Sequence, residues 1–171
     1  MSRTSDLLQA AVRELLSNRT FVKPVLAINA ASAATVKTTN AIVYSVDGVM
    51  YSKALLSAQS IAVTNNFTGS TGGAYVQPAS TTVFYTLALD ASGNVSVTQG
   101  TYAGQDLSQR SVGASAKGNG LIPDAPAGTA PFGVLKVATN SSTTFTPGTT
   151  ALDAAGVTVG YYDVSVLPST L

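Results

Sequence analysis

The chain has 171 residues, a net charge of +1 and no Cys, His or Trp. Without Cys and His there are no disulfide bonds, no thiol nucleophiles, no Cys- or His-ligated zinc and no Ser–His or Cys–His hydrolase. A net charge near zero argues against nucleic acid as a main partner.

The remaining composition favours β-structure. Ser and Thr make up 41 of the 171 residues, and only 10% of residues are charged, against roughly 25% in an average globular chain. Small, β-branched and hydroxyl residues suit strands and tight turns better than helical surfaces. We therefore expect a mainly β protein, an antiparallel, hairpin-rich sandwich or barrel-like domain over residues 21–171, preceded by a short amphipathic helix within residues 1–20.

The N-terminal stretch carries one apolar stripe at helical period. Its residues are Leu7, Leu8, Ala11, Val12, Leu15 and Leu16. A helix of about eleven residues is too short to be stable alone, so the stripe must be buried. Two surfaces remain open as the place where the stripe is buried. One is the chain's own β-domain, and the other is a partner or symmetry mate. Asp6 and Glu14 interrupt the stretch, and no apolar run reaches the roughly 18 residues of a membrane span, so we expect neither a secretory signal nor a membrane partner.

The first predicted hairpin surrounds an Asp-Gly turn at residues 47–48. Both turn positions favour positive φ, which predicts a type I′ turn between the strands Ile42–Val46 and Val49–Lys53. A two-residue turn also fixes the register, and it places Tyr44 opposite Tyr51 on one face.

The second predicted hairpin pairs Val83–Asp90 with Asn94–Gln99 around the three-residue loop 91–93. A loop ending in Gly fits a type I turn followed by a left-handed glycine. The pairing sets Leu89 opposite Val95 and gives the first strand a clean alternating apolar face.

The later strands are less regular. Gly133–Thr139 carries apolar residues on both faces, as a buried strand does, and we expect Thr143–Thr146 to return beside it. A last strand is predicted at Val157–Val166 and ends before a proline, and shorter strands at Lys23–Ile28 and Ser60–Thr64.

The stretch Thr101–Pro131 differs from its surroundings. Its 31 residues hold five Gly and three Pro, and so long a piece without secondary structure is unusual in a compact domain. Two interpretations stay open: a mobile loop, or an arm that orders against another subunit.

No local pattern indicates catalysis. Residues 90–94 lack the spaced acidic ligands of a calcium loop, and residues 113–120 fail the spacing of a phosphate-binding loop. We therefore expect no enzyme activity, metal or cofactor. Four tyrosines suit either a sugar-binding surface or cross-strand pairs in the core, and we expect the core pairs. These residues are Tyr44, Tyr51, Tyr85 and Tyr102.

Several stretches resemble virion proteins of tailed bacteriophages, of the head decoration (cement) and head-fibre kind. They are IVYSVDGVMYSKA (Ile42–Ala54), FYTLALDASGNVSVTQGTY (Phe84–Tyr102), IPDAPAGTAPFGVLKVAT (Ile122–Thr139) and the segment Thr144–Ser169. The resemblance covers over half the chain and contains no catalytic motif.

The resemblance implies a β-rich homotrimer, made in the host cytoplasm and bound to the capsid exterior over contacts between major capsid protein subunits. An alternative is a head- or tail-fibre module that binds host-surface glycan. The candidate inter-subunit contacts are the N-terminal stripe and the arm, namely Leu7, Leu8, Ala11, Val12, Leu15, Leu16, Leu121, Ile122 and Pro123.

Overall fold

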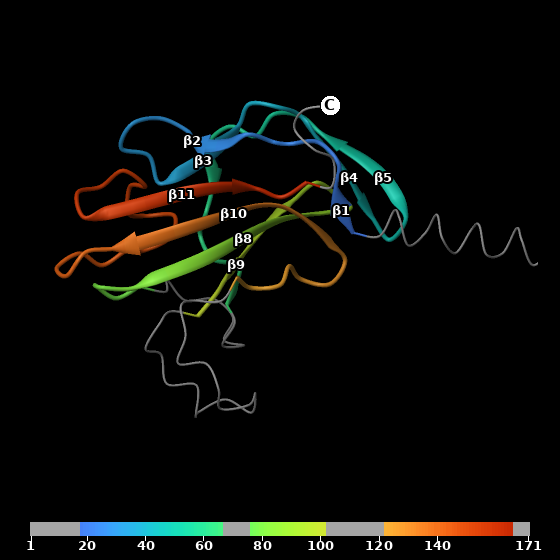
Figure 1. Cartoon of the computed structure of the whole chain (residues 1–171). Coiled ribbons are helices and arrows are strands. Elements are labelled where there is room, and N and C mark those ends of the chain that lie inside the picture. The colour runs from blue at the N-terminus through green and yellow to red at the C-terminus, as the bar shows by residue number, and fades with distance from the viewer. Residues whose placement is uncertain (1–17, 67–75, 102–121, 166–171) are drawn as a thin grey trace, which may run out of the picture.

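The computed structural model describes residues 18–66, 76–101 and 122–165, and within them the chain is all β with no helix. Figure 1 shows the strands gathered into one body. The expectation of a mainly β, antiparallel protein is therefore confirmed. The expected N-terminal helix falls on residues 1–17, which lie outside the described residues, and Arg19–Thr20 at the end of the 1–20 segment form strand β1.

The largest sheet has five strands in the order β11-β10-β8-β9-β7. Its neighbours run antiparallel, apart from the short parallel pair β7–β9. The strands are β7 (Asn65–Asn66), β8 (Thr82–Asp90), β9 (Val95–Gln99), β10 (Thr129–Thr139) and β11 (Val157–Asp163). β8 and β10 are long and central, and Figure 1 shows them flanked by β11 and β9.

Two three-stranded sheets complete the described structure, in the orders β1-β4-β5 and β2-β3-β6. Their strands are β1 (Arg19–Thr20), β2 (Leu26–Ile28), β3 (Thr35–Thr38), β4 (Ile42–Val46), β5 (Val49–Lys53) and β6 (Gln59–Ser60). Hydrogen bonds tie both to the large sheet. The hydroxyl of Thr20 donates to the carbonyl of Pro131 at 2.8 Å, and the N–H of Leu26 donates to the carboxylate of Asp163 at 2.8 Å.

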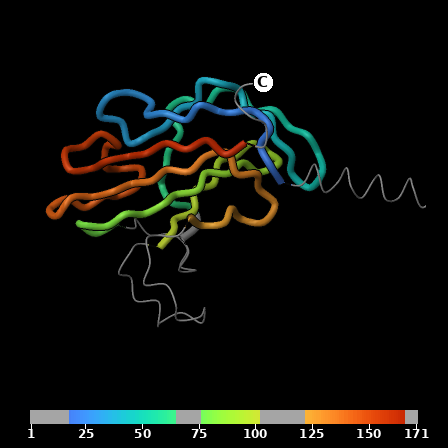
Figure 2. Tube along the Cα trace, in the orientation of Figure 1, coloured from blue at the N-terminus to red at the C-terminus, as the bar shows by residue number. Residues whose placement is uncertain are grey.

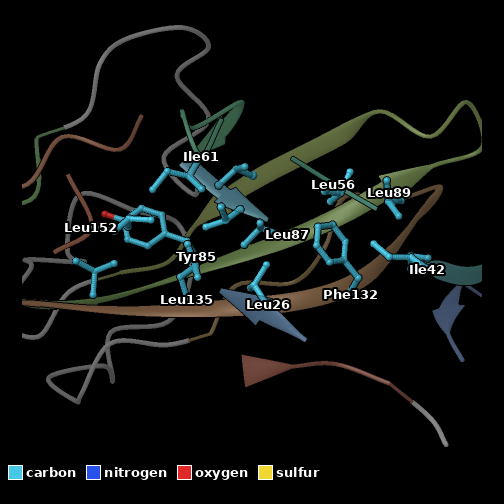
Figure 3. Packing of buried hydrophobic residues seen from close by; sticks show 14 of the residues in the cluster. Leu26, Ile42, Leu56, Ile61, Tyr85, Leu87, Leu89, Phe132, Leu135 and Leu152 are labelled. Carbon is cyan, nitrogen blue, oxygen red and sulfur yellow. The ribbon is translucent and has the colours of Figure 1, made fainter. Parts of the chain in front are cut away.

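One apolar core joins all three sheets (Figure 3). The alternation along β8 creates it, because every second side chain of a strand points to the same face. Val83, Tyr85, Leu87 and Leu89 are fully buried on that face. The small sheets and the loops cover them with Leu26, Val36, Ile42, Tyr44, Val46, Leu56, Ile61, Phe145 and Leu152.

Both predicted hairpins are confirmed, including their registers. Tyr44 lies opposite Tyr51 with ring centroids 5.6 Å apart, and Leu89 lies opposite Val95. The Asp-Gly turn has φ of 51° and 79°, as a type I′ turn requires. The large buried strand is also confirmed, but it begins earlier, at Thr129.

One pairing was predicted wrongly. Thr143–Thr146 does not return beside β10, because β8 and β11 already occupy both of its edges. Phe145 instead forms an isolated antiparallel β-bridge with Gln77. The main-chain N–H of Gln77 donates to the carbonyl of Phe145 at 2.7 Å, and the N–H of Phe145 donates to the carbonyl of Gln77 at 3.0 Å. The ring of Phe145 enters the core against Tyr85, with centroids 6.2 Å apart.

Candidate interaction surfaces

The residues proposed from the sequence as contacts are mostly outside the described structure. The stripe from Leu7 to Leu16 and Leu121 lie there, so their contacts stay predictions. Of the two described residues, Ile122 is 60% exposed and Pro123 is buried. The carbonyl of Pro123 accepts a hydrogen bond of 2.7 Å from the buried hydroxyl of Thr86. This part of the arm is thus anchored on the large sheet.

This anchor identifies a second face of the large sheet, opposite the core. Thr86 alternates with the core residues of β8, so its side chain points away from the core. Pro123 therefore lies on this side of β8. The other part of this face, over β10 and β11, is more exposed, and we call it the open face.

The open face is built around a row of paired residues. Phe84 of β8 lies opposite Lys136 of β10, which lies opposite Gly160 of β11. Lys136 is exposed, whereas the residues before and after it in β10 are buried. Two residues after Gly160 in β11, Tyr162 lies opposite Val134 of β10, and this tyrosine is 52% exposed.

Gly160 lets the ring of Tyr162 lie along the sheet. A side-chain carbon at Gly160 would come within 3.1 to 3.4 Å of two ring carbons and the hydroxyl oxygen of Tyr162. Because glycine has no such carbon, the ring rests on the backbone of β11 and keeps half of its surface exposed. The open face therefore presents an aromatic ring and one cation on a rigid sheet, an arrangement suited to packing on another surface.

A different kind of surface lies along β5. It is the last strand of its sheet, and Figures 1 and 2 show the β4–β5 hairpin at the periphery of the molecule. Apolar side chains are exposed here: Val49 is 52%, Met50 48% and Leu55 57% exposed. Within the described residues no strand pairs with the outer edge of β5. Exposed apolar residues beside such an edge are typical of an interaction site.

The tyrosines considered for sugar binding are mainly structural. Tyr44 and Tyr85 are buried in the core, and Tyr51 is half-buried against Tyr44. Burial is the largest cause of the raised pKa of Tyr44, and the nearby Asp90 and Tyr51 raise this pKa further. The Tyr44 hydroxyl donates a hydrogen bond to the carbonyl of Asp90 at 3.0 Å. Tyr102 lies outside the described residues. The expectation of core pairs is confirmed for the described three.

Asp90 is used by its own turn. Its carboxylate accepts hydrogen bonds from the main-chain N–H groups of Ser92 and Asn94 and from the side-chain amide of Asn94, at 2.8 to 2.9 Å. The Asn94 side chain, then its main-chain N–H, hold the pKa of Asp90 below its ordinary value. Among the described residues, no three acidic groups lie close enough to hold a metal ion.

Sequence reasoning missed Lys136, Tyr162 and Met50 as surface residues. The strand bounds and the period of two would have found Tyr162, since Tyr161 and Tyr162 are neighbours and must point to opposite faces.

In the described ranges the chain forms no helix of the length and apolar character needed to cross a membrane. Comparisons with protein-family models, with curated proteins and with solved structures found no match to this chain.

Proposed function

We propose that the chain is a capsid decoration (cement) protein of a tailed bacteriophage. It is made in the host cytoplasm and binds the capsid exterior as a homotrimer. There it stabilises contacts between subunits of the major capsid protein. The resemblance of four segments to phage virion proteins supports this proposal, as does a composition without Cys or His. In this proposal the mechanism is mechanical: each copy adds interface area between capsid subunits, and repetition multiplies modest contacts into high avidity.

The observation that carries the proposal is the open face. It lies on the most extensively paired sheet of the described structure, with Tyr162 and Lys136 exposed. In the proposed architecture the protein is a β-sandwich whose small sheets cover the core side of the large sheet. The open face is then the side that meets the capsid, with the N-terminal helix and the arm as further contacts.

Binding to naked, expanded capsids tests the proposal. Purified protein is mixed with capsids assembled from the major capsid protein of the same phage, and bound protein is measured after sedimentation. We expect saturable uptake by the wild type, and uptake at least about tenfold weaker for Tyr162→Ala, because aromatic residues dominate binding at such surfaces. Leu55→Ala is the matched control, since Leu55 is also exposed but lies outside the open face. No uptake by the wild type at saturating concentration would refute the proposal.

A second function is favoured by the same side chain. A half-exposed tyrosine ring lying along a strand suits stacking against a sugar, as in a fibre module that binds host-surface glycan. Under this alternative, Tyr162→Ala abolishes binding to a glycan array while capsid uptake is absent in both proteins. The two experiments together separate the functions.

A further inference from the structure

The edge of β5 has hydrogen-bonding groups that its own sheet does not use. In a two-residue hairpin the residues next to the turn exchange both main-chain hydrogen bonds, and such pairs then alternate along the strands. Val49, Tyr51 and Lys53 of β5 are therefore bonded to β4. Met50 and Ser52 direct their N–H and C=O groups outward, away from β4.

A hydrogen bond on the other side of β4 supports this alternation. Val43 lies opposite Ser52, and its carbonyl accepts a hydrogen bond of 2.8 Å from the N–H of Phe21. The groups of Val43 thus point away from β5, as the alternation requires, and those of Ser52 point away from β4.

Two of the features with which proteins block strand addition are missing from β5. Between Val49 and Lys53 there is no proline, and the pairing with β4 runs without a bulge. The only charge in β5 is Lys53, at its end. The four outward groups are the main-chain N–H and C=O of Met50 and of Ser52. Only an extended chain with the same spacing of donors and acceptors can form hydrogen bonds with all four.

We infer that a second copy of this chain occupies the edge, with its β5 antiparallel to the first about a two-fold axis at Tyr51. In this register Met50 lies opposite the partner's Ser52, and Ser52 lies opposite the partner's Met50. Each of these pairs exchanges two main-chain hydrogen bonds, so all four outward groups of each strand are used.

The side chains agree with this register. Tyr51 lies opposite the partner's Tyr51, and aromatic cross-strand pairs stabilise antiparallel sheets. Lys53 lies opposite the partner's Val49, which places the two lysines at opposite ends of the paired segment. At about 3.4 Å per residue they are roughly 14 Å apart along the strand, beyond a Debye length at physiological salt. No like charges meet.

The paired segment is short, so the contact is weak in isolation. Five residues from each copy bury well under the roughly 800 Å² per partner of a standard stable interface. Association therefore needs high protein concentration, or several such contacts acting together. The inference is independent of capsid binding. If the protein is a trimer, as proposed above, the two-fold contact joins one trimer to the next.

Sedimentation velocity over a concentration series tests the pairing. We expect the wild type to shift toward twice its starting mass as concentration rises. Ser52→Pro removes an outward N–H without removing a bond to β4, so this variant is expected to keep its starting mass. Ser52→Thr keeps the N–H and is the matched control that behaves like the wild type. A wild-type mass that is constant up to about millimolar concentration, or a Ser52→Pro variant that associates normally, overturns the inference.

Disulfide trapping tests the register without introducing proline. The chain has no Cys, so the single variants Met50→Cys and Ser52→Cys each carry one thiol on an exposed side chain. Under mild oxidation we expect a cross-linked dimer from the mixture of the two variants, and several-fold less from either alone. Equal cross-linking in all three samples, or none in the mixture, overturns the proposed register.

Discussion

Replacing Phe132 tests whether one core holds the three sheets together. Phe132 lies at the bulge of β10 between Pro131 and Gly133, and it is fully buried in the cluster that contains Ile42 of β4 and Leu89 of β8 (Figure 3). Truncation of a buried Phe to Ala costs about 3–5 kcal/mol, because the lost burial adds to the cavity left behind. We expect Phe132→Ala to lower the free energy of unfolding by that amount.

Urea unfolding followed by circular dichroism measures this loss. Total stabilities are about 5–15 kcal/mol, so the variant is expected to fold with a lower midpoint and an unchanged slope. In a chain of this size the melting temperature should fall by roughly 6–20 °C. Tyr162→Ala, on the open face, should change stability by no more than about 0.5 kcal/mol. A loss below about 1 kcal/mol for Phe132→Ala would refute the single shared core.

Three further predictions concern backbone strain and charge, and all are read from urea midpoints. Gly156 has φ of 84° and a side-chain carbon there would collide with Thr143 and Asn140, whereas Gly128 has φ of 72° and open space. Gly128→Ala should therefore lose about 1–2 kcal/mol and Gly156→Ala clearly more; equal losses would contradict the packing. Val25 has φ of 56°, rare for a β-branched residue, so Val25→Asn should gain about 1 kcal/mol, and a loss would contradict the strain. Because the folded pKa of Asp90 is lowered, its stabilisation is present above the ordinary value of 3.8 and is lost as pH falls through the folded pKa. Asp90→Asn should thus be less stable at about pH 7 and lose less than the wild type on going to about pH 3; parallel pH profiles would contradict this assignment.

The hairpins were predictable because their information is local. An Asp-Gly turn requires positive φ at two adjacent positions, and that requirement alone sets the register that brings Tyr44 to Tyr51. The same holds for the second hairpin, where the position of Gly93 in the loop fixes the pairing of Leu89 with Val95.

The long-range pairing was not predictable in this way. Thr143–Thr146 has the composition of a strand, but nothing in it specifies that Phe145 bridges Gln77 rather than β10. The strand Thr35–Thr38 was missed because three of its four residues, the two threonines and Lys37, are polar like the surrounding loop. Tertiary contacts decide such short segments, since strand propensity depends strongly on context.

The candidate surfaces needed the structure for a related reason. Whether Lys136 and Tyr162 share a face depends on the register between β10 and β11, which are separated by a loop too long to fix it. The outward direction of Met50 and Ser52, by contrast, follows from the turn and was within reach of the sequence.

Cryo-electron microscopy of naked, expanded capsids incubated with the protein tests the central proposal most directly. Decoration predicts additional density on the outer capsid surface, over contacts between major capsid protein subunits, with the open face and Tyr162 turned toward the capsid. Capsids without additional density, or bound protein with Tyr162 facing solvent, would contradict the account.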